Sequence, residues 1–397
     1  MDFADKRILL TQNSLAEIAG SEVVTLEIAS YLLGQGARPT VYTYDFDQPM
    51  QGHFEGRGIT VVTQRNNDLH TGDFDFVWVH HQVLPPNLIR ELGDRSQQSR
   101  PAFIFNHMSP FDSLPLERPY LWGLEDLVAA TTLFVSEETR LALSALYAGQ
   151  QSFDLFPNPA PPEFADAGYV PAPGLRNVLI TSNHIPAELS RARELLAARG
   201  IKTVHLGSSG DRLTVLTPAI LGEFDLVVTI GKTVQYGLTM GVPVYVYDIH
   251  GGPGYLCGSN IAQAAAVNFS GRDCPRARSP ESLVDDIMSG YAQAVLYQQS
   301  RRAEFVQAYS LDAVLPRVFE QAVPREIDAD DRYVRYLETA ECLAAQLIRS
   351  TRVEGRALKL YRQALDDVLN SRAYGVGQKI ATPVRKARRV VQALRRS

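Results

Sequence analysis

DLVVTIGKTVQYGLTMGVPVYVYDIHGGPGYLCGSN, residues 225–260, predicts a strand, a tight turn, a short helix, a second strand and a glycine-rich loop that precedes another helix. Residues 226–230 are apolar and β-branched without alternation, which is typical of a strand buried on both faces. Elements in this order are typical of a parallel α/β sheet, which binds small molecules at the carboxyl ends of its strands. We therefore expect the chemistry of this chain near the two turns of the stretch.

The first turn predicts an anion site. Gly231, Lys232 and Thr233 bring a glycine, a cation and a hydroxyl to the start of the helix, where free backbone N–H groups and the helix dipole favour a phosphate. The second turn, at 250–254, is rich in glycine, and glycine lets a ligand approach the backbone closely. The alternative is that these glycines only form turns. Their placement after two consecutive strands favours the ligand site.

Composition limits the class of protein. The chain has 397 residues, enough for two or three ordinary domains, and its net charge of −5 gives no argument for binding nucleic acid. Its three cysteines are too few and too scattered for a disulfide framework or a zinc site, which favours a reducing cytosol. The start of the sequence has no signal-peptide pattern, and no run of about 18 apolar residues occurs. We expect a cytoplasmic protein.

Strand and helix patterns alternate twice along the chain. We predict an amino-terminal Rossmann-like domain at 1–165, a second Rossmann-like domain at 172–305, and a helical extension at 306–397. The proline- and alanine-rich residues 158–174 are interpreted as a linker between the first two. Further strands are predicted at 6–11, 39–44, 58–63, 74–80, 102–107, 132–136, 177–182 and 202–207.

The final residues, 383–397, carry six basic side chains between Arg385 and Arg396 and no acidic one. At helical spacing the apolar residues between them form one face, which predicts an amphipathic helix on an anionic membrane surface. The alternatives are a solvated tail or a helix that binds a partner protein. The membrane interpretation places the protein peripherally on the inner face of the plasma membrane.

Two Rossmann-like units with glycine loops resemble the GT-B glycosyltransferases, over about residues 6–320. The motifs are most similar to the large retaining family that includes bacterial cell-surface glycan enzymes. In the first half the similarity rests on the helix-opening loop AGSE at 19–22, and on HHQ at 80–82, NH at 106–107, SEET at 136–139 and PNP at 157–159. In the second half, GGPGY at 251–255 and NFSGR at 268–272 resemble a branch of polysaccharide-assembly proteins.

This resemblance implies a sugar transfer from a nucleotide-sugar co-substrate, with no other cofactor and no metal, to a bacterial cell-surface glycan or its lipid-linked precursor. The donor would bind mainly to the second domain and the acceptor to the first. Gln235 stands where the family has a carboxylate, which leaves the nucleotide open. Two rivals remain: a nucleotide-sugar epimerase of similar fold, and a non-catalytic GT-B-like partner of a glycan-assembly complex, which the amide of Gln235 favours.

The resemblance and the turn pattern together give three groups of candidate residues. Each of them has a structural interpretation as an alternative. The donor-binding candidates are Gly231, Lys232, Thr233, Gln235, Tyr236, His184, Gly207, His250, Gly251 and Gly252, with Arg272 as a further cation. The acceptor-side loop contributes Gly20 and Ser21, and the catalytic candidates are His107, Asp112, Glu22 and His81.

The stereochemical course stays open at this point. An inverting enzyme needs a general base at the acceptor hydroxyl, and Asp112, Glu22 or a histidine could serve. In a retaining enzyme the donor phosphate can take the proton, and His107 would orient the sugar. The DxD tripeptides at 45–47 and 73–75 suit a metal-bound diphosphate, but they lie at strand edges away from the predicted donor turn, so we expect no metal site.

Overall fold

The computed structural model describes residues 1–63, 68–93, 100–111, 117, 119–147, 152–274, 277–327 and 330–370. Residues 1–345 form one compact unit and residues 346–397 another. The first unit contains two sheets, which come from different halves of the chain. The domain boundaries that the sequence suggests stay a prediction.

The first sheet has seven parallel strands in the order β3-β2-β1-β4-β5-β6-β7. Strand β1, next to the central strand β4, carries Ile8, Leu9 and Leu10, which are fully buried, as an unbroken apolar run requires. The sequence predicts six of the strands, but not β7, because three of its four residues are exposed and form no apolar run. The strands are β1 (Arg7–Gln12), β2 (Arg38–Thr43), β3 (Thr60–Thr63), β4 (Phe76–His80), β5 (Ala102–His107), β6 (Ala129–Phe134) and β7 (Ser152–Leu155).

The helices between these strands are short except for the first. α1 (Gly20–Gly34) is buried over 22–29, including two glutamates, so it is an interior helix. The SEET motif begins α5, where the Ser136 hydroxyl caps the helix by accepting a hydrogen bond from the backbone N–H of Thr139. The other helices are α2 (Met50–Glu55), α3 (Pro86–Glu91), α4 (Trp122–Val128), α5 (Glu137–Leu143) and the 3₁₀ turns Thr71–Asp73 and Ser144–Leu146.

The second sheet has five strands in the order β12-β11-β10-β8-β9. It is parallel except for β12, which pairs antiparallel with β11. The sequence interpretation of 251–254 as a loop is therefore wrong. A Cβ atom on Gly252 would lie 2.1 Å from the carbonyl oxygen of Val246, so this glycine allows close approach of the neighbouring strand and not of a ligand. The strands are β8 (Asn177–Thr181), β9 (Lys202–Leu206), β10 (Leu226–Thr229), β11 (Val244–Asp248) and β12 (Gly251–Tyr255).

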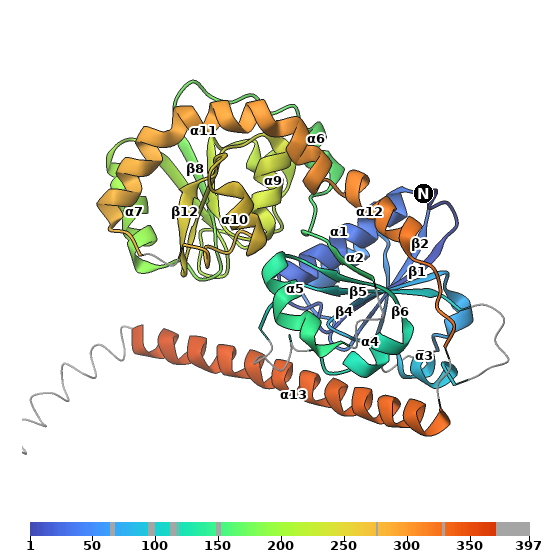
Figure 1. Cartoon of the computed structure of the whole chain (residues 1–397). Coiled ribbons are helices and arrows are strands. Elements are labelled where there is room, and N and C mark those ends of the chain that lie inside the picture. Colours follow the sequence, from blue (N-terminus) through green and yellow to red (C-terminus); the bar gives the residue numbers. More distant parts are fainter. Residues whose placement is uncertain are drawn as a thin grey trace, which may run out of the picture. The chain divides into compact units, whose positions relative to one another are not determined.

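Helices cover this second sheet, and the long helix α11 packs against α7 and α9 (Figure 1). α6 lies inside the segment that the sequence suggests as a linker, and its Phe164 stacks on Tyr236 of α9 with ring centroids 4.2 Å apart. This part of the suggested linker is therefore a helix that packs against α9. The helices are α6 (Pro162–Asp166), α7 (Ala187–Ala198), α8 (Pro218–Leu221), α9 (Lys232–Met240), α10 (Ile261–Ala266) and α11 (Pro280–Tyr309).

After α11 the chain returns to the first sheet. Leu311, Leu315 and Phe319 of α12 (Leu311–Gln321) are buried in the core of that sheet. Phe319 stacks on Trp78 at 5.7 Å and meets Phe3 and Phe76 edge-on. The sequence assigns this helix to an extension, but it supplies core side chains to the first sheet.

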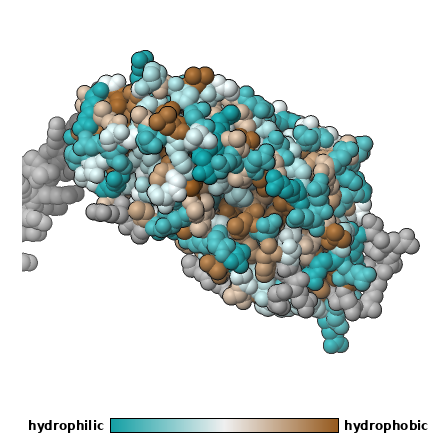
Figure 2. All heavy atoms as spheres, turned by 45° about the horizontal axis from the view of Figure 1, so that its top comes forward, coloured by the Kyte–Doolittle hydropathy of each residue, from teal (hydrophilic) through white to brown (hydrophobic). Residues whose placement is uncertain are grey.

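α13 (Asp331–Asn370) is the last helix of the described residues. Within those residues no helix combines the length and the hydropathy that a membrane crossing requires. The face in Figure 2 carries small groups of hydrophobic residues separated by hydrophilic ones. The predicted amphipathic helix at 383–397 lies outside the described residues.

We expect Phe319→Ala to lower the free energy of unfolding by about 3–5 kcal/mol, because it removes a ring from a filled aromatic cluster. Urea unfolding measures this loss. Leu296→Ala is the control, because 65% of that side chain is exposed on α11, and we expect a change within about 0.5 kcal/mol. Equal losses in the two variants would contradict the docking of α12.

Candidate functional site

A cavity of about 360 Å³ lies at the carboxyl ends of β8, β10 and β11 and is bounded on one side by the start of α1. This is the edge at which parallel α/β sheets bind ligands. The structure brings six of the predicted site residues into its lining: Gly20, His184, Gly207, Lys232, Thr233 and Tyr236.

Two helices begin at this cavity. Gly20 is the first residue of α1, and Lys232 is the first residue of α9. The first N–H groups of a helix have no partner within the helix and carry its positive dipole end, so both helix starts favour an anion. Gly231 precedes α9 at φ 59° and ψ −134°, a backbone conformation open only to glycine. The turn residues of the sequence motif therefore shape an edge of the cavity at which helix N–H groups favour an anion.

Lys232 takes part in a buried charge cluster at this edge. Its Nζ lies 2.7 Å from Glu27 Oε2 of α1 and donates to the backbone oxygens of Asn158 and Pro159. The hydroxyl of Tyr236 donates to the other oxygen of Glu27, and the Lys232 ammonium lies 5.0 Å from the Tyr236 ring centre. The cluster joins α1 of the first sheet to α9 of the second.

Burial sets the protonation equilibria of this cluster. It raises the pKa of the Glu27 carboxyl, and the charge of Lys232 opposes the rise. It lowers the pKa of Lys232, and Glu27 opposes the fall. Each charge therefore depends on the other for its ionised state.

A carboxylate that the sequence analysis missed also lines the cavity. Asp248 ends β11 and is 4% exposed, and it accepts hydrogen bonds from the Ser182 hydroxyl and from the backbone N–H of Ile249. The feature of the sequence that could have identified Asp248 is an acidic residue at the end of a buried strand. The sequence analysis also missed Glu27. The feature that could have identified it is an acidic residue inside an otherwise apolar helix pattern.

The remaining donor candidates lie outside the cavity lining. Gln235 is fully buried, and its side-chain amide donates to the backbone oxygen of Pro157 at 2.8 Å. His250 is exposed, while Gly251 and Gly252 belong to β12. Ser21 of the acceptor-side loop donates to Glu22 at 2.8 Å. Arg272 Nε donates to Glu138 at 2.9 Å and so forms a second ion pair between the two halves of the chain.

The catalytic candidates are not gathered at the cavity. His107 Nε2 is buried 3.0 Å from Glu125 Oε1 and 3.0 Å from the hydroxyl of Tyr147. Burial, together with the charge of Glu125, raises the pKa of Tyr147. His81 Nδ1 lies 3.6 Å from Glu117. Glu22, His81 and His107 do not line the cavity, and Asp112 lies outside the described residues.

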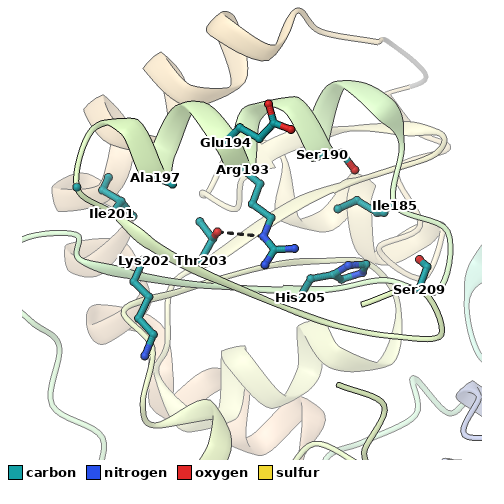
Figure 3. Close-up of a pocket in the computed structure, with 11 residues that line it drawn as sticks. Ile185, Ser190, Arg193, Glu194, Ala197, Ile201, Lys202, Thr203, His205 and Ser209 are labelled. Atoms are coloured by element: carbon teal, nitrogen blue, oxygen red, sulfur yellow. Dashed lines mark hydrogen bonds between the residues drawn. The ribbon is translucent and has the colours of Figure 1, made fainter. Parts of the chain in front are cut away.

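A larger hollow, of about 720 Å³, lies beside α7 and β9 (Figure 3). Figure 3 shows Arg193 reaching over it toward Thr203, and its Nε donates to the Thr203 hydroxyl at 3.1 Å. The guanidinium is also paired with Asp211. Lys202 also lines this hollow, and Arg193 is paired there as Lys232 is in the cavity. The cavity differs in that, within the described residues, its lining includes the first residue of α9, which follows the Gly231 turn.

Among the described residues, no three histidine, cysteine or acidic side chains are arranged to hold a metal ion. The DxD carboxylates have protein partners. Asp45 accepts from the Ser14 hydroxyl at 3.0 Å, and Asp75 pairs with Arg7 at 3.0 Å.

Comparison with solved structures identifies the fold. HepE from Anabaena, crystallised with UDP-glucose, is 13% identical, with a TM-score of 0.50 over 79% of this chain and 98% of that one. The fold is GT-B. A glycosyltransferase from Rickettsia africae is 12% identical over 80% of this chain and 97% of its own, with a TM-score of 0.48. No protein-family model and no curated protein matches the chain. The fold class predicted from the sequence is confirmed.

We expect Glu27→Gln to lower the free energy of unfolding by about 3–5 kcal/mol, because it leaves the buried Lys232 ammonium without its counter-charge. Lys232→Met should cost a similar amount for the converse reason. The double variant should lose less than the sum, since no unpaired charge remains. Urea unfolding of the four proteins completes the cycle, with Tyr236→Phe as a control that removes one hydroxyl and neither charge. Strictly additive losses would show that the pair is not coupled.

Proposed function

We propose that the protein is a glycosyltransferase that moves a sugar from a nucleotide-sugar donor to a bacterial cell-surface glycan or its lipid-linked precursor. The observation that supports this most is the cavity at which α1 and α9 begin, beside Lys232. A GT-B neighbour was crystallised with UDP-glucose, which is consistent with a nucleotide sugar as co-substrate. The donor would lie mainly on the second sheet and the acceptor on the first.

The proposed chemistry needs stabilisation of a leaving phosphate. When the bond between the sugar carbon and the phosphate oxygen breaks, negative charge grows on that oxygen. The N–H groups at the start of α9 and the Lys232 ammonium supply positive charge there, so we assign them the charge stabilisation and propose a metal-independent reaction. The acceptor hydroxyl forms the new bond to the sugar carbon. In an inverting course it gives its proton to a protein base, and in a retaining course it gives its proton to the leaving phosphate. The configuration of the product distinguishes the two courses.

A non-catalytic GT-B-like partner is the second candidate. Two observations support this candidate, because they show candidate site residues occupied by protein contacts. The Lys232 ammonium is paired with Glu27, and His107 is hydrogen-bonded to Glu125 and Tyr147 inside the first sheet. Turnover separates the two: hydrolysis or transfer with purified protein supports the enzyme, and nucleotide binding without turnover of any donor supports the partner protein.

We expect a nucleotide sugar to raise the melting temperature, because a ligand that binds only the folded state stabilises it. A screen of UDP, GDP, dTDP and CMP sugars at millimolar concentration measures the shift. Lys232→Met should weaken binding of the effective donor about tenfold to a hundredfold, through loss of a charge-assisted contact with phosphate. Lys202→Met, which removes a cation that lines the hollow beside α7 and not this cavity, is the control and should change it less than about threefold. The donor site is refuted if none of the four classes shifts the melting temperature.

We also propose that the protein acts at the inner face of the plasma membrane, held there by residues 383–397. The support is the cluster of six basic residues in that tail. Deleting 383–397 should abolish sedimentation with vesicles that contain anionic lipid, while the shift caused by the donor stays unchanged. Equal sedimentation of the full and shortened chains would exclude this role for the tail.

A further inference from the structure

The cavity contains a buried carboxylate beside groups that favour an anion. Asp248 lines the same cavity as Lys232 and Thr233. Among the described residues Asp248 forms no ion pair within 4.0 Å, and Lys232 is paired with Glu27. Burying an unpaired carboxylate is unfavourable unless hydrogen bonds compensate it. Its charge also repels a phosphate, so a neutral hydrogen-bond donor is the better ligand for Asp248.

The Asp248 side chain is held in one orientation. The Ser182 hydroxyl donates to its two oxygens at 3.1 and 2.9 Å, and the backbone N–H of Ile249 donates to Oδ1 at 2.8 Å. The Ser182 oxygen in turn accepts from the backbone N–H of His184 at 2.9 Å, which fixes the direction of the hydroxyl. A carboxylate has about four acceptor positions. The two donors named here leave Asp248, and chiefly its Oδ2, able to accept from a ligand.

The chemistry of a nucleotide sugar matches this arrangement of charge. Its diphosphate is anionic and suits the helix starts and Lys232. Its ribose and its transferred sugar carry neighbouring hydroxyl groups, which are neutral donors and make strong charge-assisted bonds to a carboxylate. The lining of the cavity therefore contains groups that suit each of the two parts of one ligand.

We propose that Asp248 binds neighbouring hydroxyl groups of the nucleotide sugar, in its ribose or in its transferred sugar, and thereby sets the direction in which the donor lies in the cavity. This inference rests on the proposed function. Asp248 supplies the carboxylate that the sequence analysis looked for at Gln235, which instead points to the backbone of Pro157. Ser182 is a positioning residue, because it acts through Asp248.

The test is calorimetric titration of the full chain and of Asp248→Asn with UDP, GDP, dTDP and CMP sugars, the free nucleotides, and pyrophosphate. Asparagine keeps the shape and removes the charge. We expect about tenfold to a hundredfold weaker binding of the nucleotide sugar, and pyrophosphate binding that is unchanged or tighter. Asp286→Asn is the matched control, because Asp286 lies on α11, accepts from the Tyr245 hydroxyl at 2.7 Å and does not line the cavity.

The ligands separate the two sources of hydroxyl groups. If Asp248 binds the ribose, the free ribonucleotide weakens in Asp248→Asn as much as the nucleotide sugar does. If it binds the transferred sugar, only the nucleotide sugar weakens. Equal affinity of the wild type and Asp248→Asn for every nucleotide that binds would overturn the inference and leave the proposed function standing. A wild type that binds none of the nucleotides would overturn both.

Discussion

The ion pair between Glu27 and Lys232 is the interaction on which the cavity depends. It joins a helix of the first sheet to a helix of the second, with both side chains about nine-tenths buried. Two isolated charges at such a place would be strongly unfavourable, and the pair is tolerated because Tyr236 and two backbone oxygens complete its hydrogen bonds. The pair thus holds the starts of α1 and α9 at the same cavity.

This arrangement places charged groups and helix starts in a cavity whose lining also includes apolar side chains such as Val23, Leu216 and Ile230. The ammonium of Lys232 is paired with Glu27, and the N–H groups of the two helix starts add positive potential beside it. Asp248 adds a negative group to the same lining. A ligand with one anionic part and one hydroxyl-rich part complements these features better than an inorganic anion does.

A strand or helix could be predicted from the sequence where its own residues show a characteristic pattern. β10 and β11 are unbroken apolar runs, and α9 begins after a glycine with a backbone conformation that other residues avoid. β12 could not be predicted, because its glycines resemble a loop until the neighbouring strand is in place. α12 could not be assigned to the first sheet, since its partners Phe3 and Trp78 are distant in the sequence.

The same limit applies to the site. The turn around Lys232 was predicted from local pattern, but Glu27 was not, because its hydrogen bond to Tyr236 joins residues 209 apart in the sequence. His107 ends a strand as predicted, yet its ring is hydrogen-bonded to Glu125 within the first sheet. A position at the end of a strand does not by itself reveal the direction of a side chain.

A crystal structure of the protein with a nucleotide sugar tests the central claim most directly. We predict that the diphosphate lies within hydrogen-bonding distance of the backbone N–H groups of Lys232 and Thr233, in the cavity at which α1 and α9 begin. A nucleotide bound elsewhere, for example in the hollow beside α7 and β9, would contradict it.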